Sequence, residues 1–576
     1  MRLDLSGVLL SGCLLASSLV ALPVARGAEP STSPEVAEAA GDAESADAPN
    51  EEAGASGEAS TDEQETEEGE SLQVETTARA PMEEFVTPRA VNVVDEEEIQ
   101  QKQAQSVTDA LDEEPGVFIQ STNRGAGSVF LRGLVGPENV IYFDGVRFNQ
   151  STFRTGPNQY LDTMDPWALR RLEVVRGPGS VLYGSGAMGG VIQALPRSLP
   201  EEELELRGIG FYEVADNSFG GALDTGVRAG DWAVAGGATF RDHGELRIGR
   251  TGGESVLAPG EEENRVPGSS YEENYFRGAT GVDLSDRSLL RFNYYGGFVD
   301  DATRVDRLGG GEVRLYDNRD DLMYLTYEYD GPASVDQLTV NASYHRTYER
   351  VDRFNCETEA FRGEDSIQVT PDPRGCARRR PDLLVKHRIN EDTVQTIGSS
   401  LSGVSRLFDR ALRISWGADF YQDRVESSRR DATAPGFVFE EKSRGNFSDG
   451  SRYTEAGLYT HADWRFARVG QSDFFATLGG RLAHFGAFAP EVSDELGDVS
   501  YDFTGVVGSA GIKYLYSTKL NAHLTWNQGF RAPNLQESTV LGNTGNFFEV
   551  PNDGLGPERS NTVELGAKLD FPALGR

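Results

Sequence analysis

Apolar and polar residues alternate along most of the chain from about residue 203 onward. The clearest segments are residues 453–466, 520–527 and 562–571, in which most apolar side chains fall on every second position. A period of two places these side chains on one face of a β-strand. About fourteen such segments follow one another, separated alternately by short turns and long polar stretches, which predicts an antiparallel sheet of long strands.

Two kinds of protein show such alternation, a soluble β-sandwich and an outer-membrane β-barrel. These segments run well past the ~5–6 residues of an ordinary strand, and their apolar face carries Trp, Tyr and Phe. Short turns at one end of the strands and long loops at the other are typical of membrane barrels. We therefore predict a transmembrane β-barrel.

Residues 81–200 have a different pattern, that of a compact α/β domain. A polar stretch at residues 95–111 predicts one or two helices, and short apolar runs predict strands. The predicted strands are residues 91–94, 117–119, 128–131, 140–143 and 172–175.

A glycine-rich stretch, residues 176–192, raises the question of phosphate binding. Gly184, Gly186 and Gly189 have the spacing of a dinucleotide-binding fingerprint, but that motif requires a helix to follow, and Pro196 leaves no room for one. A P-loop is excluded as well, because the residues after Gly184 are not the required Lys and Ser or Thr. The glycines therefore do not predict a cofactor site, and no cofactor is expected.

The N-terminal part lacks any such pattern. Residues 1–28 predict an export signal with cleavage near residues 25–28, and lipidation of Cys13 is the alternative. Residues 29–70 contain 15 Asp or Glu and no Lys or Arg, so we expect a disordered acidic spacer. The whole chain carries a net charge of -38, which argues against nucleic acid as a partner.

Few residues suggest chemistry. None of the six histidines has metal-ligand spacing, and no Ser/His/Asp or Cys/His arrangement suggests catalysis, so neither a metal site nor an enzyme is predicted. Cys356 and Cys376 flank a polar loop, for which a disulfide, two free thiols and a metal site are the alternatives. Disulfides persist in exported proteins, which favours a Cys356–Cys376 bridge.

Several motifs, in order along residues 71–576, resemble those of the TonB-dependent outer-membrane receptors. Those of the plug domain are PRAVNVVDEEEIQ from Pro88, VTDAL from Val107 followed by PGV, LRG from Leu131, VIYFDGVRFN from Val140, and DPWALRRLEVVRGPGSVLYGSGAMGGVIQALPR from Asp165. FRAP at residues 530–533 and PERSN at residues 557–561 resemble the barrel motifs. The resemblance implies a plug, residues 81–200, inside a barrel, residues 201–576, in the outer membrane of a Gram-negative bacterium, with the N-terminal spacer in the periplasm.

The last plug motif is similar to the family's most specific signature. The resemblance implies tight turns that pack against the inner barrel wall, where glycine permits close approach of the backbone. Glu173 and Arg176 would be the charges that hold the plug reversibly in a polar lumen. The signature residues are Glu173, Arg176, Gly177, Pro178, Gly184, Gly186, Gly189 and Gly190.

Residues 71–80 lie where the family keeps its TonB box. Such a segment pairs edge-on with the TonB protein of the inner-membrane energy-transducing complex, mainly through main-chain hydrogen bonds. A plain linker strand is the alternative. The predicted box residues are Leu72, Gln73, Val74, Glu75, Thr76, Thr77 and Ala78.

The loop of residues 149–160 corresponds to a plug loop that rises toward the outside in the family. Phe153, Arg154, Asn158 and Tyr160 are expected to contact the ligand, and Arg154 suits an anionic chelate. A loop packed on the barrel wall is the alternative.

The function that the resemblance implies is energy-coupled import of a scarce nutrient. A ferric siderophore or another iron complex is the first expectation from the family, and cobalamin and haem are the alternatives. Haem is less favoured, because the histidine expected in haem-binding relatives is absent between Pro533 and Pro557. A passive porin or an adhesin without energy coupling is the alternative from another class.

The family's barrel has about twenty-two strands. About fourteen are counted here, and only one clear strand follows the FRAP motif. We therefore expect the sequence to be truncated at its C-terminal end by roughly eight strands.

The predicted disulfide has a direct test. A peptide map made without reduction should show the peptides of Cys356 and Cys376 linked, and replacing both residues by Ser should destabilise the chain. A loop of this length contributes about 3 kcal/mol in the chain-entropy model. Free alkylation of both thiols in protein from oxidising conditions would contradict the bridge.

Overall fold

The computed structural model describes residues 73–75, 79, 81–156, 158, 160–247, 268–305, 312–332, 334–356, 362–363, 366–367, 384–544 and 547–570. The predicted export signal and acidic spacer lie outside this part of the chain, as do Leu72, Thr76, Thr77, Ala78 and Cys376. Within it, no helix combines the length and the apolar character needed to cross a membrane.

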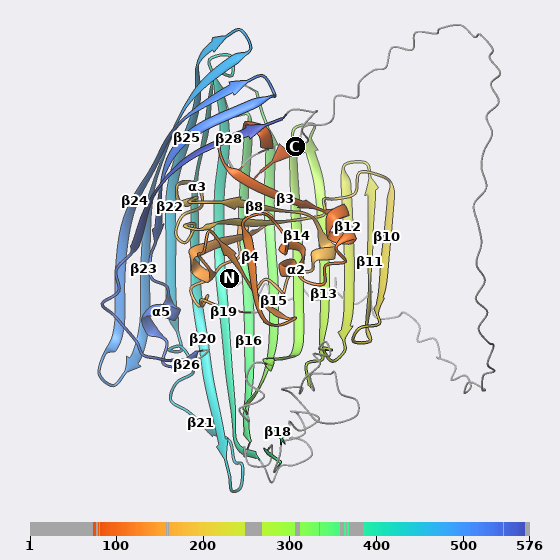
Figure 1. The fold of residues 1–576 in the computed structure, drawn as a ribbon, viewed down its shortest axis with the longest axis vertical. Helices are drawn as coiled ribbons and strands as arrows, with labels where there is room; N and C mark the ends of the chain where they lie inside the picture. Colours follow the sequence, from red (N-terminus) through yellow and green to blue (C-terminus); the bar gives the residue numbers. More distant parts are fainter. Residues whose placement is uncertain are drawn as a thin grey trace, which may run out of the picture. The chain divides into compact units, whose positions relative to one another are not determined.

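In the described part of the chain, fourteen strands form one antiparallel sheet, in which neighbours in space follow one another along the chain (Figure 1). They confirm the predicted number of about fourteen. A two-residue strand, β21 (Glu440–Glu441), adds to β20. The fourteen strands are β10 (Leu204–Glu213), β11 (Ser218–Ala229), β12 (Trp232–His243), β13 (Tyr271–Ser285), β14 (Ser288–Thr303), β15 (Glu312–Asp330), β16 (Gln337–Cys356), β19 (Leu384–Leu407), β20 (Leu412–Thr433), β22 (Ser451–Val469), β23 (Ser472–Ser493), β24 (Gly497–Tyr516), β25 (Leu520–Arg531) and β28 (Glu558–Leu569).

The outer face of this sheet is apolar and the inner face is polar, the reverse of a soluble protein. In β22, Leu458 is 62% exposed and Trp464 is 52% exposed, whereas Glu455 is buried. In β23, Leu478 is exposed and Arg481 is buried. A continuous apolar surface of this size is unfavourable in water and favourable in lipid, so it is the membrane face of a barrel wall.

The sheet has a turn end and a loop end. At the turn end, the strands are joined by residues 230–231, 286–287, 331–336, 408–411, 470–471 and 517–519. The loop end has most of the long connections, among them residues 434–450 and residues 532–557, which contain α5 (Leu535–Thr539), β26 (Gly542–Thr544) and β27 (Phe547–Glu549). Among the described strands, β10 and β28 each pair on one side and are the edges of the sheet.

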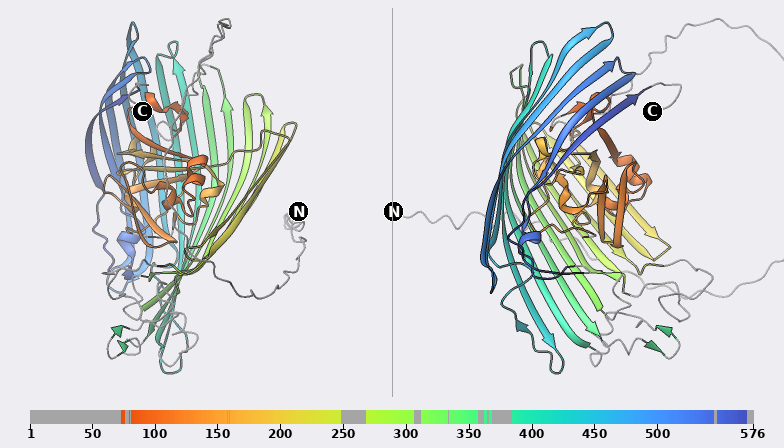
Figure 2. Two further views of the ribbon diagram at one scale, coloured as in Figure 1. Left: turned by 45° about the vertical axis from the view of Figure 1, so that its right-hand side comes forward. Right: turned by 60° about the vertical axis from the view of Figure 1, so that its left-hand side comes forward.

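A small α/β domain, the plug, lies on the inner side of the sheet, which curves around it (Figure 2). Its mixed sheet has the order β3 (Ala90–Asp95), β8 (Leu169–Arg176), β9 (Gly190–Pro196), β6 (Asn139–Phe143) and β7 (Val146–Arg147), with β6 and β9 parallel. A hairpin of β4 (Val117–Asn123) and β5 (Ala126–Leu131) and the helices α1 (Glu96–Gln101), α2 (Val107–Leu111) and α3 (Ser180–Tyr183) complete it.

The plug elements follow from local sequence. The five predicted strands are present, and the stretch at residues 95–111 forms two helices, each of which begins at a capping side chain, Asp95 or Ser106. The apolar pattern does not predict β9, because this strand starts at a glycine and ends at a proline. The plug core, with Leu111, Leu131 and Leu172 fully buried, continues onto tyrosines of β13, β14 and β15, so plug and wall share one apolar cluster.

Candidate functional site

The glycine-rich signature packs against the FRAP motif at the end of β25. Gly186 donates its N–H to the carbonyl of Phe530 at 3.0 Å, and the Ser180 hydroxyl accepts from the N–H of Phe530 at 3.0 Å. The Ser185 hydroxyl accepts from the N–H of Ala532 at 2.9 Å. At least one partner in each of these hydrogen bonds is a main-chain group, so the backbones of plug and wall must approach closely.

Two signature glycines allow this approach. Gly184 and Gly186 have φ of +79° and +88°, a region that side chains disfavour. A Cβ on Gly186 would lie 2.5 Å from the carbonyl oxygen of Pro137, and one on Gly184 would lie 2.7 Å from a carboxylate oxygen of Glu455 in β22. The glycines thus serve turn geometry and close packing.

Glu173 of the signature binds the box segment, a name used for the described residues 73–75 and 79. Glu173 is fully buried, and its two carboxylate oxygens accept from the N–H of Glu75 at 2.9 and 3.2 Å. The Glu75 carboxylate accepts in turn from Arg170 at 2.8 Å and Arg171 at 3.2 Å, and Arg171 also pairs with Glu173 at 2.8 Å. Val74 is fully buried.

Glu173 and Arg176 are the charges expected to hold the plug reversibly in the lumen, and that role stays a prediction. The described partners of Glu173 belong to the box segment and to the plug itself. Arg176 lies over Gly116 of the plug, so closely that a Cβ there would be 2.2 Å from its guanidinium. These described contacts join parts of the plug and the box segment.

Arg79, four residues after Glu75, joins the box segment to both plug and wall. Its guanidinium lies 5.3 Å and 4.8 Å from the ring centres of Tyr142 and Tyr183 in the plug and 5.1 Å from that of Tyr459 in β22. It also donates to the Tyr142 hydroxyl at 2.7 Å and lies 3.6 Å from Asp419 in β20. Desolvated cation–π contacts are worth up to about 2 kcal/mol each, so this is a strong anchor.

Beside this anchor, one ion pair fastens the plug to β22, and a second joins the wall strands β20 and β23. Arg147 of β7 pairs with Glu455, and Arg481 donates to Asp419 at 2.9 Å. All four charges are largely removed from water. Cations and anions alternate through the cluster, which compensates each buried charge.

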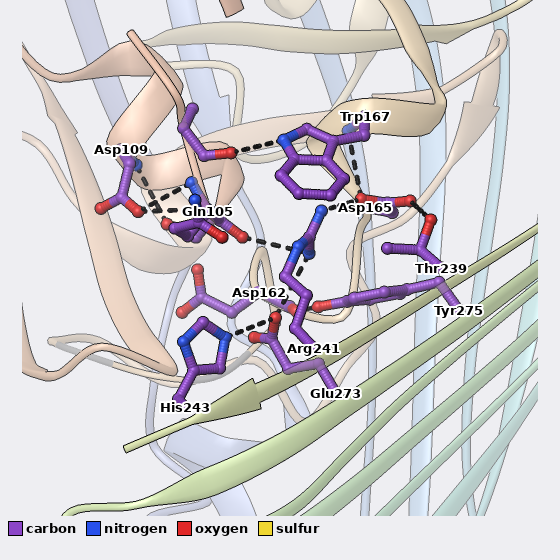
Figure 3. A network of polar contacts seen from close by, with 12 residues as sticks. Gln105, Asp109, Asp162, Asp165, Trp167, Thr239, Arg241, His243, Glu273 and Tyr275 are labelled. Carbon is purple, nitrogen blue, oxygen red and sulfur yellow. Dashed lines mark hydrogen bonds and ion pairs between the residues drawn. The ribbon is translucent and has the colours of Figure 1, made fainter. Parts of the chain in front are cut away.

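A second polar network fastens the other side of the plug to β12 and β13 (Figure 3). Arg241 pairs with Asp165 of the plug and with Glu273 at 3.3 Å, and its guanidinium lies 4.1 Å from the Trp167 ring. His243 lies 3.1 Å from Glu273. The sequence gives no signal for this network, because any polar residue is compatible with an inward-facing strand position.

Asp162 lies in the same region without a cationic partner among its described contacts. Its carboxylate accepts from the Gly127 N–H at 2.9 Å and from the Thr108 hydroxyl at 3.2 Å. Burial, and then the nearby acids Asp109 and Glu273, raise the pKa of Asp162 well above its usual value.

The predicted ligand residues fall into two groups. Phe153 is buried and stacks on Tyr160 with ring centres 4.1 Å apart, and the Asn158 amide donates within the loop to the Gly156 carbonyl at 3.1 Å. Arg154 donates to both oxygens of Glu349 in β16, at 3.0 and 2.6 Å. An anion that binds Arg154 therefore has to displace a carboxylate.

Arg154 and Tyr160 line a cavity between the loop and strands β15, β16 and β19 at the loop end. Its volume is about 40 Å³, which leaves room for only a few water molecules. The lining is mostly hydroxyl, amide and charged groups. A small-molecule ligand would need the loop or the side chains around it to move.

The described residues provide no metal site and leave the predicted bridge open. No group of three or more His, Cys, Asp or Glu side chains in this part of the chain could hold a metal ion. Cys356 is disulfide-bonded. Cys376 is not among the described residues, so the Cys356–Cys376 pairing stays a prediction.

A polar-lined barrel wall with an α/β domain fastened inside it defines the class of plugged outer-membrane receptors. Residues 84–191 match the family model of the TonB-dependent receptor plug domain, and residues 263–575 match that of the TonB-dependent receptor-like β-barrel. The chain therefore belongs to the TonB-dependent receptor family, which confirms the fold class of barrel and plug.

Relatives in this family bind different ligands. A hemin receptor of Yersinia enterocolitica is 25% identical over 511 residues, 85% of this chain and 64% of that receptor. A ferrioxamine B receptor of Salmonella typhimurium is 35% identical over 117 residues, 19% of this chain and 16% of that receptor. The chain thus spans less than two thirds of the length of these relatives.

Two solved structures show the same fold. A copper transporter has a TM-score of 0.63 at 16% identity, covering 84% of this chain and 69% of the transporter. A siderophore receptor of Acinetobacter baumannii has a TM-score of 0.60 at 16% identity, covering 87% of this chain and 73% of the receptor. At this identity the likeness concerns the fold alone.

Close packing at the signature predicts that two glycine substitutions lower the stability of the fold by different amounts. Gly186→Ala and Gly230→Ala both place a side chain at positive φ, which costs ~1–2 kcal/mol. Gly186→Ala adds a clash with Pro137, for a further ~1–3 kcal/mol, whereas no described atom lies within 4 Å of a Cβ on Gly230. Urea titration of the folded chain in detergent, followed by trypsin sensitivity of the plug, should show the larger loss for Gly186→Ala. Equal losses would contradict the role of close packing.

The raised pKa of Asp162 predicts a pH dependence of stability. The folded state holds this proton more tightly than the unfolded state, so the contribution of Asp162 is full below about pH 4 and is lost as pH rises through the folded-state pKa. Relative to Asp162→Asn, the wild-type chain should lose up to about 1.4 kcal/mol per pH unit across that range. Urea titrations of both proteins from pH 4 to 8 measure the difference. A constant difference would show that Asp162 is charged throughout.

Proposed function

We propose that this chain forms the plug and part of the barrel wall of an energy-coupled receptor that imports a ferric siderophore or another iron complex. The observation that carries the proposal is the box segment bound to Glu173. A short extended strand is held by a buried carboxylate of the plug signature, and it would link the periplasmic side to the interior of the plug. The family membership and the ligands named for its relatives support the import of a bound nutrient.

The TonB protein would take hold of residues 72–78 by adding a strand to their backbone. Within the described residues, β1 (Gln73–Val74) pairs with the two residues of β2 (Met82–Glu83). So short a pairing is easily exchanged for a longer one. The plug is different, because separating its buried ion pairs costs several kcal/mol for each charge left without a partner. This difference favours a mechanism in which the TonB protein binds the box easily and then supplies the work that moves the plug.

The cavity at the loop end favours a polar chelate that carries its own metal ligands. Its described lining includes no His, Cys or Met side chain that could replace such a ligand. Arg154 and Tyr160 would contact the chelate after the Arg154–Glu349 pair opens. Cobalamin and haem are the alternative substrates within the family. A passive pore is disfavoured, because the shared apolar cluster and the ion pairs hold the plug against the inner face of the wall.

Growth under iron limitation tests the proposal. Cells that express the receptor should grow on at least one iron chelate from a panel, and only in the presence of TonB. Val74→Pro removes a backbone N–H and fixes φ, so it should abolish growth while ligand binding persists. Val74→Ala, which keeps the backbone, is the control and should retain growth.

Two outcomes would contradict parts of this proposal. Growth that does not depend on TonB or survives Val74→Pro would point to passive uptake. Growth rescued only by haem or cobalamin would move the substrate to one of the alternatives.

A further inference from the structure

The inner face of the wall carries a cluster of cations at the loop end. Glu349 of β16 and Asp392 of β19 line the loop-end cavity, so their side chains face the lumen. Arg353 and Arg388 lie four residues nearer the loop end of the same strands, and every second residue of a strand points to the same face. These two arginines therefore face the lumen as well, roughly 13 Å beyond the cavity at ~3.3 Å per residue.

Three arginines stand opposite one another in neighbouring strands of this wall. Arg314 of β15 pairs in register with Arg353 of β16, and Arg353 pairs with Arg388 of β19 (Figure 1). The Cβ atoms of such paired residues lie ~4.5–5.5 Å apart, and like charges there destabilise a sheet. Strand pairing alone therefore disfavours this row. Its presence in a chain with a net charge of -38 indicates a role that requires positive charge.

One carboxylate serves three cations at the end of the row. Asp431 of β20 pairs in register with Arg388 and lies 3.3 Å from its guanidinium. Lys386 lies 3.0 Å from the same carboxylate, and Arg429 lies 2.6 Å from it. In these described contacts, a single negative charge is divided among three positive ones.

Two more carboxylates lie on this face of the sheet. Glu312 of β15 is shared by two arginines of the row, Arg314 and Arg353. Glu440 of β21 is bound by Lys442 at 3.0 Å, so this pair is neutral. Apart from that pair, the described residues of the cluster are five cations and two carboxylates. The five cations, here named the outer cation cluster, are Arg314, Arg353, Lys386, Arg388 and Arg429.

The cations that share Asp431 keep accessible donors. The Asp431 side chain is 6% exposed, whereas those of Lys386 and Arg429 are 30% and 26% exposed. The described hydrogen bond of Arg388 to Asp431 uses the Nε–H group, and a guanidinium has four further N–H donors. A ligand in the lumen therefore meets N–H groups of cations, and the carboxylate lies beneath them.

The position of the cluster restricts the kind of anion that can reach it. Long loops face the outside in outer-membrane barrels, so the cluster lies on the outer side of the loop-end cavity. Lipid phosphates contact the outer face of the wall, whereas these side chains point into the lumen. Carboxylate, phosphate and catecholate oxygens all accept charge-assisted hydrogen bonds from guanidinium groups. The occupant is therefore a soluble anion that enters from the outside.

We propose that the outer cation cluster is an anion-binding site and that the imported iron complex carries a net negative charge. The identity of the anion as the imported complex rests on the proposed function, whereas the site itself does not. Ferric complexes of catecholates and α-hydroxycarboxylates are anionic, and haem carries two propionates. A neutral or cationic hydroxamate complex gains nothing from this cluster. The site thus divides the family's substrates by their charge.

Fluorescence polarisation of pyranine, a small polyanionic dye, tests the site on the purified full chain in a non-ionic detergent. Lys386→Gln with Arg388→Gln removes two cations and leaves Asp431 paired with Arg429. This pair of substitutions should weaken pyranine binding about 10- to 100-fold, because each lost charge-assisted hydrogen bond is worth roughly a factor of ten. High salt should weaken binding by the wild-type chain and reduce the difference.

Arg350→Gln with Arg430→Gln is the matched control. These two arginines lie near the loop end of β16 and β20, on the opposite face, in ion pairs of 2.6 and 2.7 Å. The control changes the net charge of the chain by the same amount and should leave pyranine binding unchanged. Equal weakening by both pairs of substitutions would overturn the site, because it would show a response to total charge alone.

Two further measurements separate binding from folding. The substitution of Arg388 relieves its repulsion with Arg353, so the Lys386 and Arg388 glutamines should not lower the urea midpoint of unfolding. Asp431→Asn removes the shared carboxylate and should tighten pyranine binding several-fold. A lower midpoint for the glutamine pair would assign the cluster a structural role. That result, or weaker binding by Asp431→Asn, would overturn the site.

Growth under iron limitation tests the charge of the substrate. On an anionic chelate, such as ferric citrate or a ferric catecholate, the Lys386 and Arg388 glutamines should raise the concentration needed for half-maximal growth about tenfold. The Arg350 and Arg430 glutamines should not. Growth of the wild type on neutral or cationic chelates alone would overturn the charge assignment and leave iron import intact. Growth on no iron complex would contradict the proposed function, while the pyranine measurements still decide whether the anion site exists.

Discussion

The charges on the inner face of the barrel wall have to find their partners inside the lumen, because the outer face belongs to lipid. A buried charge whose partner is removed destabilises a fold by several kcal/mol. The plug supplies many of these partners: Asp165 compensates Arg241, and Arg147 compensates Glu455. The plug therefore supplies counter-charges that the wall needs. This explains why ion pairs hold the plug on two sides.

The sequence predicts the strands and helices of this fold better than the side-chain contacts that join them. Alternation and short apolar runs are local properties, so the long strands and most plug strands follow from them. Alternation also places Arg241 and Glu455 inward, but their pairing depends on distant segments. The motif identifies Glu173, yet this residue binds the N–H of Glu75, 98 residues away. Arg79 carries no sequence signal, because a lone arginine looks the same whether it is solvated or enclosed by tyrosines.

The box segment is held at Glu75 and at Arg79. Its release leaves no buried charge without a partner at either position. Asp419, which faces Arg79, keeps Arg481 as a partner at 2.9 Å. Arg171, which binds Glu75, keeps Glu173 at 2.8 Å. Release therefore avoids the cost of an orphaned buried charge on either side. The segment can be held firmly and still be withdrawn and returned.

The order of the strands bears on how the receptor assembles. Each wall strand pairs with its neighbour along the chain, so the sheet can grow hairpin by hairpin through contacts that are local in sequence. The signature is different, because Ser180 bonds to Phe530, 350 residues later. The plug cannot reach its seat until β25 is in place. A cell that makes this protein must therefore keep the plug soluble and unaggregated while the wall strands from β10 to β25 are still being built.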